Sequence, residues 1–185
     1  MIIEKTELKD AYIIIPDVFG DARGYFTETY TKNKLEGITD AVFVQDNQSY
    51  SSQKGIIRGL HCQINPHCQT KLIRCTKGEI SDVIVDIRKG SPTYKKWIKI
   101  TLSAENKKQL LIPKGFLHGF ETLTDEVEVQ YKVDDYYSKE CDRSVKFDDP
   151  ELGVEWETVN PLVSDKDKNA PLFSESDCIF NYEEK

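Results

Sequence analysis

The chain has 185 residues and a formal net charge of −7; 38% of its residues are hydrophobic and 31% are charged. A chain of this length can bury a core within one domain, and an aromatic content of 10% argues against disorder. The acidic balance lacks the basic footprint of nucleic-acid binding, so we expect no nucleic-acid partner.

The start of the chain, MIIEKTELKD, is charged and has no apolar core of the kind found in a secretory signal. No apolar run approaches the roughly 20 residues of a membrane span. The sequence therefore predicts a cytoplasmic protein with no membrane partner. Five cysteines in a reducing compartment predict free thiols rather than disulfides.

Short apolar runs, often with period two, dominate the chain between about residues 12 and 131. They predict strands at 12–16, 25–30, 42–45, 71–75, 82–87, 97–102, 109–113 and 127–131. Two short segments, 31–37 and 164–170, look helical. Many short strands separated by turns predict an all-β sandwich or barrel. We expect one domain over 1–185, with a jelly-roll core at about 12–150 and a C-terminal tail at 151–185 that wraps it.

The stretch RGLHCQINPHCQTK, from Arg58 to Lys71, contains two of the three histidines, which raises the question of a metal site. Metal-binding cupin barrels usually carry His-x-His, then a Glu six residues before a Gly, and a later His. Here Gln63 stands in place of the second His, and Lys71 stands in place of the Glu. A lysine cation repels a divalent metal, and Gln is a poor ligand for metals that prefer imidazole. The sequence therefore predicts no metal.

The segment VEVQYK alternates, so Val127, Val129 and Tyr131 share one strand face. This apolar face should point inward and carry the Tyr131 hydroxyl with it. A buried tyrosine can make a structural hydrogen bond or can act as a proton donor, and the pattern alone leaves both readings open.

A set of motifs in a fixed order resembles the dTDP-4-dehydrorhamnose 3,5-epimerase family from about Ile13 to Pro171. The set comprises DARGYFTETY, FVQDNQS, GIIRGLHCQ, QTKLIRCTKGEISDVIVDIRKGSPTYKKW, LSAENKKQLLIPKGFLHGF, YKVDDYY and SDKD. The resemblance implies a cupin-like double-stranded β-helix jelly roll with short helices. It also implies cofactor-independent epimerisation at C3 and C5 of dTDP-4-dehydro-6-deoxy-D-glucose through an enolate.

The resemblance assigns four residues to catalysis. His61 matches the base, and Asp167 matches the carboxylate that orients it. Tyr131 matches the acid on the opposite face of the sugar, and Lys71 matches the cation near the keto oxygen. Without the resemblance, Asp167 would be read as an ordinary solvated loop residue.

The resemblance also assigns substrate-binding positions and a homodimer. These positions are Arg23, Glu28, Gln45, Asn47, Arg58, His118, Tyr137, Asp142 and Lys166. Arg23 and Glu28 match a segment that reaches across from the partner subunit, and Tyr137 matches an aromatic that stacks on the base. Glu140 competes with Asp142 for one acidic contact. The alternative interpretation of Arg23, Glu28 and Lys166 is plain surface charge.

Departures from the family pattern keep other functions open. Cys62 stands where an aromatic is common, Phe147 replaces a Trp, and Lys139 replaces a Pro. A C3- or C5-only epimerase and a 3,4-ketoisomerase are alternatives, although Cys62 occupies the place of the second His that a ketoisomerase usually has. A non-catalytic nucleotide-sugar binding module and a metal-dependent oxygenase are alternatives from other classes.

The spacing between Arg58 and His61 presents a geometric difficulty. Strict alternation along a strand places these two residues on opposite faces. A bulge at Gly59 would let both side chains point inward, so we predict one there.

Overall fold

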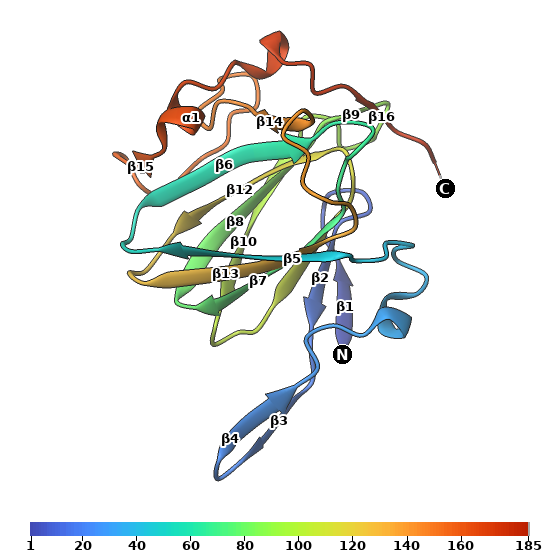
Figure 1. Ribbon diagram of the computed structural model, residues 1–185, viewed down its shortest axis with the longest axis vertical. Helices are drawn as coiled ribbons and strands as arrows, with labels where there is room; N and C mark the ends of the chain where they lie inside the picture. Colours follow the sequence, from blue (N-terminus) through green and yellow to red (C-terminus); the bar gives the residue numbers. More distant parts are fainter. Residues whose placement is uncertain (185) are drawn as a thin grey trace.

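The computed structural model describes residues 1–184 and shows two antiparallel sheets packed face to face (Figure 1). The first sheet has the order β1 (Ile2–Lys5), β2 (Tyr12–Ile15), β11 (Gln109–Ile112), β7 (Lys71–Lys77), β13 (Val127–Val133) and β5 (Gln45–Ser51). The second has the order β10 (Trp97–Ser103), β8 (Glu79–Asp86), β12 (Phe116–Thr122), β6 (Ile56–Gln63) and β14 (Asp142–Ser144), and β15 (Leu162–Val163) pairs with β6. The predicted all-β, cupin-like class is confirmed.

The core between the sheets explains why period two was visible in the sequence. Val127 and Val129 of the first sheet meet Ile80, Ile84 and Phe120 of the second in one buried cluster. On β13 these inward residues alternate with the partly exposed Glu128 and Gln130, as the pattern VEVQYK predicted.

The outer face of the second sheet is also covered, by the C-terminal tail. Phe173, Cys178 and Phe180 of the tail pack with Val83 and Val85 of β8. Because both faces of this sheet are covered, β8 is buried along nearly its whole length rather than at alternate residues. The tail carries α1 (Asp165–Lys168), η2 (Phe173–Glu175) and β16 (Phe180–Asn181), which pairs with β9 (Arg88–Lys89).

Two other segments depart from the sandwich. β3 (Val18–Asp21) and β4 (Gly24–Thr27) form a hairpin that extends away from the two sheets (Figure 1). The segment after it includes η1 (Lys32–Leu35) and packs Leu35 and Phe43 on the outer face of the first sheet. The predicted strand at 42–45 is wrong, because residues 42–44 form no strand and β5 begins at Gln45; Phe43 packs against the sheet from outside.

The irregularity predicted at Gly59 is present. His61 pairs with His118 and Arg58 pairs with Phe120, so β6 contains one more residue than β12 between the two pairs. Gly59 has a φ of +130°, and a Cβ placed on it would lie 2.5 Å from the Gly119 Cα. Only glycine fits this close approach of two strands, and the extra residue turns both Arg58 and His61 toward the interior.

Candidate active site

One cavity of about 470 Å³ between the sheets collects side chains from seven separate elements: β5, β6, β7, β12, β13, β15 and α1. It is lined by Ser49, Ile56, Ile57, Arg58, His61, Lys71, His118, Phe120, Tyr131, Leu162, Val163, Ser164, Lys166 and Asp167. This set includes all four predicted catalytic residues and three of the predicted substrate-binding residues.

His61 of β6 and Asp167 of α1 form a close pair, with Nε2 2.5 Å from Oδ1. Ser164 caps the short helix by accepting a hydrogen bond from the Asp167 amide, and the Gly59 amide donates to Asp167 Oδ2 at 3.3 Å. Burial raises the pKa of Asp167, but these hydrogen bonds and the nearby imidazole hold the pKa of that carboxyl below its ordinary value. The carboxylate fixes the His61 Nε2–H toward itself, which leaves Nδ1 free to accept a proton.

Tyr131 reaches the cavity from the opposite sheet. It lies on β13, opposite Asn47 of β5, and packs against the buried core. Burial raises the pKa of the Tyr131 hydroxyl, while the Arg58 cation acts in the other direction. A tyrosine with a raised pKa keeps its proton at neutral pH and can donate it to a carbanion.

Lys71 lines the cavity together with the cations Arg58 and Lys166, and it begins β7, beside β13. Burial lowers the pKa of the Lys71 ammonium, and the Asp142 and Asp82 carboxylates oppose that change. A desolvated ammonium stabilises a developing oxyanion more strongly than one in water, because the local dielectric is low.

His118 is held by a residue that the sequence analysis did not select. Its Nε2 lies 2.8 Å from Oδ1 of Asp82, which is fully buried on β8. Burial lowers the pKa of His118, with the Asp82 carboxylate opposing that change. The other Asp82 oxygen has no hydrogen-bond partner among residues 1–184. The sequence feature that could have identified Asp82 is its charge at the start of the mostly apolar segment DVIVDI.

Ser49 is a second cavity residue that the sequence analysis missed. It lies on β5 with its side chain on the same face as Gln45 and Asn47, and its buried hydroxyl has no partner within the described part of the chain. The period of two in QDNQSYS was the signal that could have found it.

The predicted nucleotide contacts lie at the rim. Gln45 donates to the Asn47 side chain at 2.9 Å, and the Tyr137 amide donates to Gln45 at 3.2 Å. The Tyr137 ring is 59% exposed, which leaves it free for stacking. Lys166 and Asp142 form an ion pair at 2.5 Å, so these two predicted contacts meet each other.

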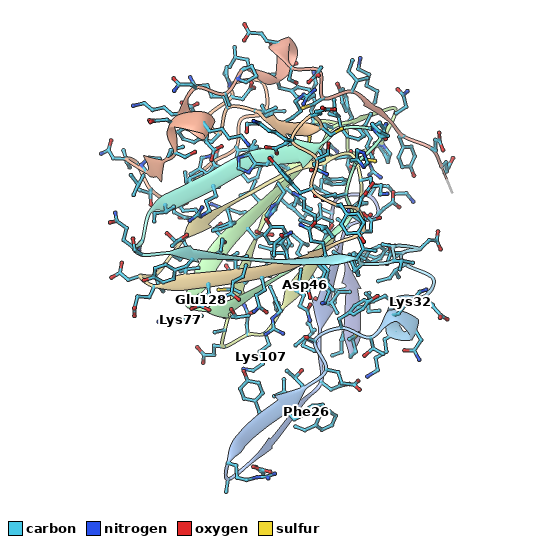
Figure 2. The ribbon with its side chains drawn as sticks, viewed as in Figure 1. Phe26, Lys32, Asp46, Lys77, Lys107 and Glu128 are labelled. Atoms are coloured by element: carbon cyan, nitrogen blue, oxygen red, sulfur yellow. The ribbon has the colours of Figure 1, made fainter. Side chains whose placement is uncertain are left out.

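Arg23 and Glu28 are not brought to this cavity. Arg23 lies in the turn between β3 and β4 with its side chain 89% exposed, and it pairs with Asp21 at 2.5 Å. Glu28 pairs with Lys34 of η1. Figure 2 places Phe26, on the same hairpin, well away from the sandwich.

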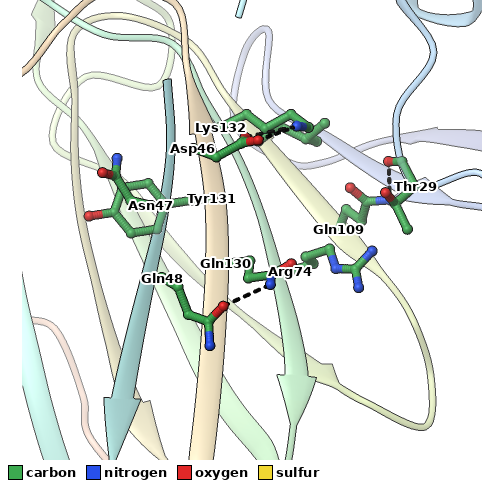
Figure 3. A pocket seen from close by; sticks show the side chains of 10 residues that line it. Thr29, Asp46, Asn47, Gln48, Arg74, Gln109, Gln130, Tyr131 and Lys132 are labelled. Carbon is green, nitrogen blue, oxygen red and sulfur yellow. Dashed lines mark hydrogen bonds and ion pairs between the residues drawn. The ribbon is translucent and has the colours of Figure 1, made fainter. Parts of the chain in front are cut away.

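A second hollow of about 310 Å³ lies on the outer face of the first sheet (Figure 3). Arg74, Gln109, Gln130 and Lys132 line it, and Lys132 pairs with Asp46 at 2.8 Å. Figure 3 shows Tyr131 and Asn47 pointing to the other side of the strands. Tyr131 and Asn47 still border this hollow, but His61, Lys71 and Asp167 line only the interior cavity.

The fold and the cavity together define a class of enzyme. A cupin-like sandwich that directs a paired histidine, a lysine and a tyrosine into one internal cavity is equipped for proton transfer on a carbon acid. Among residues 1–184, no cluster of three or more His, Cys, Asp or Glu side chains is placed to hold a metal ion. No helix in that range is long and apolar enough to cross a bilayer.

Comparison with known proteins agrees with this class. The family model described as dTDP-4-dehydrorhamnose 3,5-epimerase matches residues 5–175. The enzyme of that name from Shigella flexneri is 49% identical over 179 residues, which cover 96% of this chain and 98% of the relative. The chain belongs to the dTDP-4-dehydrorhamnose 3,5-epimerase family of isomerases.

Solved structures show the same relationship. The epimerase from Bacillus anthracis, solved with TDP and PPi bound, is 52% identical, with a TM-score of 0.89 over 92% of this chain and 98% of its own. The enzyme from Legionella pneumophila, solved in complex with dTDP-4-keto-L-rhamnose, is 41% identical, with a TM-score of 0.93 over 98% of each chain.

Proposed function

We propose that this protein converts dTDP-4-dehydro-6-deoxy-D-glucose to dTDP-4-dehydro-L-rhamnose by inverting C3 and C5. One observation carries the proposal. His61 lies on the second sheet and Tyr131 on the first, so the base and the acid face each other across a single cavity. Inversion requires proton removal from one face of the sugar and return to the other, and this arrangement supplies both.

In this mechanism, His61 Nδ1 removes the proton at C3 or C5, both of which are acidified by the C4 ketone. Asp167 stabilises the imidazolium that forms. The Lys71 ammonium stabilises the enolate oxygen at C4. Tyr131 then donates its proton to the opposite face of the carbon, and the tyrosine and histidine regain their starting states by exchange with solvent.

The nucleotide half of the substrate should occupy the rim. Gln45, Asn47 and Tyr137 offer amide groups and an exposed ring, which suit a thymine base. Arg58 lines the cavity as a cation, which suits a diphosphate. The relatives solved with TDP or a dTDP-sugar bound support a nucleotide-sugar ligand.

The competing outcome is inversion at one centre only. A 3′-monoepimerase from Streptomyces bikiniensis has the same fold, with a TM-score of 0.84, but is only 30% identical. Incubation with dTDP-4-dehydro-6-deoxy-D-glucose in heavy water tests the point. We expect NMR to show deuterium at both C3 and C5 with both centres inverted. Deuterium at one carbon alone would exclude the double epimerisation, and no exchange at all would leave a binding module.

We further propose a homodimer in which Arg23 and Glu28 complete the partner's site. The hairpin that holds Arg23 projects from the sandwich and exposes large apolar side chains: Phe19 is 62% and Phe26 is 64% exposed. Under two-fold symmetry each subunit would present its hairpin to the other.

Mixing of subunits tests this dimer. Arg23→Ala and His61→Ala homodimers should each be impaired, but exchanged heterodimers contain one intact site. We expect up to about a quarter of the wild-type activity to return, because half the dimers mix and half of their sites are intact. A fully active monomer in sedimentation would refute the proposal.

A further inference from the structure

Cys62 and Cys178 form a close thiol pair that the epimerase reaction does not use. Their sulfur atoms are 3.6 Å apart, although 116 residues separate them in the chain. Cys62 follows His61 on β6 and packs on the outer face of the second sheet, and Cys178 lies in the tail that covers this face. Exposure of the two residues is only 5% and 4%.

The chain on both sides of Cys178 is fixed to the sandwich. Just before it, Asp177 accepts two hydrogen bonds from the Arg143 guanidinium, at 2.6 and 2.8 Å. Arg143 is itself the residue opposite Cys62 in the register of β14 and β6. Just after it, β16 pairs with β9. The two sulfur atoms are therefore held together by contacts that do not depend on the thiols.

The other three thiols each contact oxygen instead of sulfur. Cys68 contacts the Asn65 side chain at 3.1 Å, and Cys75 contacts the Lys77 carbonyl at 3.1 Å. Cys141 contacts the Asn65 carbonyl at 3.8 Å. Any oxidation that links two cysteines within this chain should therefore select the pair between β6 and the tail.

We propose that Cys62 and Cys178 are a dithiol site for hydrogen peroxide, which closes to a disulfide that fastens the C-terminal tail to β6. A disulfide has an S–S length of about 2.05 Å, so the sulfur atoms must approach by about 1.5 Å. The anchors at Asp177 and at β16 keep the backbone in place while the side chains rotate.

The chemistry balances with one peroxide molecule. The Cys178 sulfur attacks one peroxide oxygen; an S–O bond forms, the O–O bond breaks, and the released hydroxide takes the thiol proton as water. The Cys62 sulfur then attacks the Cys178 sulfur; the S–S bond forms, the S–O bond breaks, and hydroxide leaves with the Cys62 proton as a second water. The hydrogen bond from Cys62 lowers the pKa of the Cys178 thiol, which favours Cys178 as the first nucleophile.

The disulfide would stabilise the folded chain and the contact between the two segments that carry His61 and Asp167. Asp167 and Cys178 belong to the same tail, and His61 and Cys62 are neighbours on β6. A covalent link between the tail and β6 restricts the unfolded chain over a long loop. It also opposes detachment of the segment that carries Asp167 from the strand that carries His61.

The experiment treats the full-length protein with a slight excess of hydrogen peroxide, blocks the remaining thiols, and maps the peptides by mass spectrometry. We expect the loss of two free thiols and a linked Cys62–Cys178 peptide about 2 Da lighter than the two thiol peptides together. The midpoint of thermal unfolding should rise by roughly 5–15 °C, and a reductant should reverse both changes. Cys178→Ser should show neither change, whereas the matched variant Cys68→Ser should show both.

Three results would overturn the proposal. One is a linked peptide that contains any other cysteine. Another is sulfinic or sulfonic acid at Cys178 with no link formed. The third is an equal rise in the unfolding midpoint of Cys178→Ser. Since the peptide map is obtained on the wild-type chain, poor folding of a variant cannot hide the answer.

Discussion

Replacement of Asp167 by Asn keeps the shape of the side chain and removes its charge. In the wild-type protein, Oδ1 lies 2.5 Å from His61 Nε2, and Asp167 is only 3% exposed. Two unit charges 4 Å apart interact by about 4 kcal/mol at an effective dielectric of 20. The His61 side chain is 31% exposed, so solvent screening reduces this value to about 2–4 kcal/mol. The stabilisation of the imidazolium lost in the variant predicts a fall in kcat of about 30- to 1,000-fold.

The assay follows deuterium entry at C3 and C5 by NMR and measures kcat and KM separately. Because Asp167 acts through His61, kcat and both exchange rates should fall together while KM changes little. Asp165→Asn is the matched control, since Asp165 belongs to the same short helix but is exposed and makes no contact with His61. If Asp167→Asn keeps kcat within threefold of wild type, the carboxylate does not support the base and the reasoning fails.

Three further predictions concern Tyr131 and Lys71 of the first sheet, and Gly119, where β12 approaches β6 closely. Tyr131→Phe should permit deprotonation but slow inversion by about 10²–10⁴-fold, so NMR should detect deuterium with retained configuration or a singly inverted sugar; normal turnover would make this tyrosine structural. Lys71→Arg should shift the alkaline limb of the kcat/KM profile to higher pH, because burial lowers the pKa of the lysine and arginine does not titrate there; an unmoved limb would contradict this. Gly119→Ala should lower unfolding stability by about 1–3 kcal/mol in denaturant, because its Cβ would lie 2.8 Å from the Arg58 carbonyl, whereas Gly20→Ala has room and should change little.

The sequence predicted the sandwich well where one strand face is buried. β13 shows its period directly, because one face meets the core and the other is partly exposed, whereas β7 buries the neighbouring Leu72 and Ile73 on opposite faces. It predicted β6 poorly, since Gly59 and the polar Arg58 and His61 interrupt the apolar pattern of a strand that is covered on its outer face. The bulge itself was predictable, because two functional side chains three positions apart had to share one face.

The active site likewise contains residues that local sequence patterns indicate and residues that only the folded chain reveals. The broken metal motif pointed to Lys71, and alternation pointed to Tyr131. The pairing of His61 with Asp167 joins residues 106 positions apart, and no local pattern carries that information. Asp82 was missed because its role depends on lying behind His118 in the neighbouring strand, which only the register reveals.

The position of Asp167 after every strand of the first sheet has a consequence for protein synthesis. During translation, β6 with its histidine is made long before α1, and the jelly-roll strands up to β13 can pair before the tail exists. A nascent chain can thus hold the base, the lysine and the tyrosine in place while still lacking the carboxylate. Full activity should therefore appear only once α1 has been made, and nascent chains stalled before α1 should epimerise the nucleotide sugar at least as slowly as Asp167→Asn.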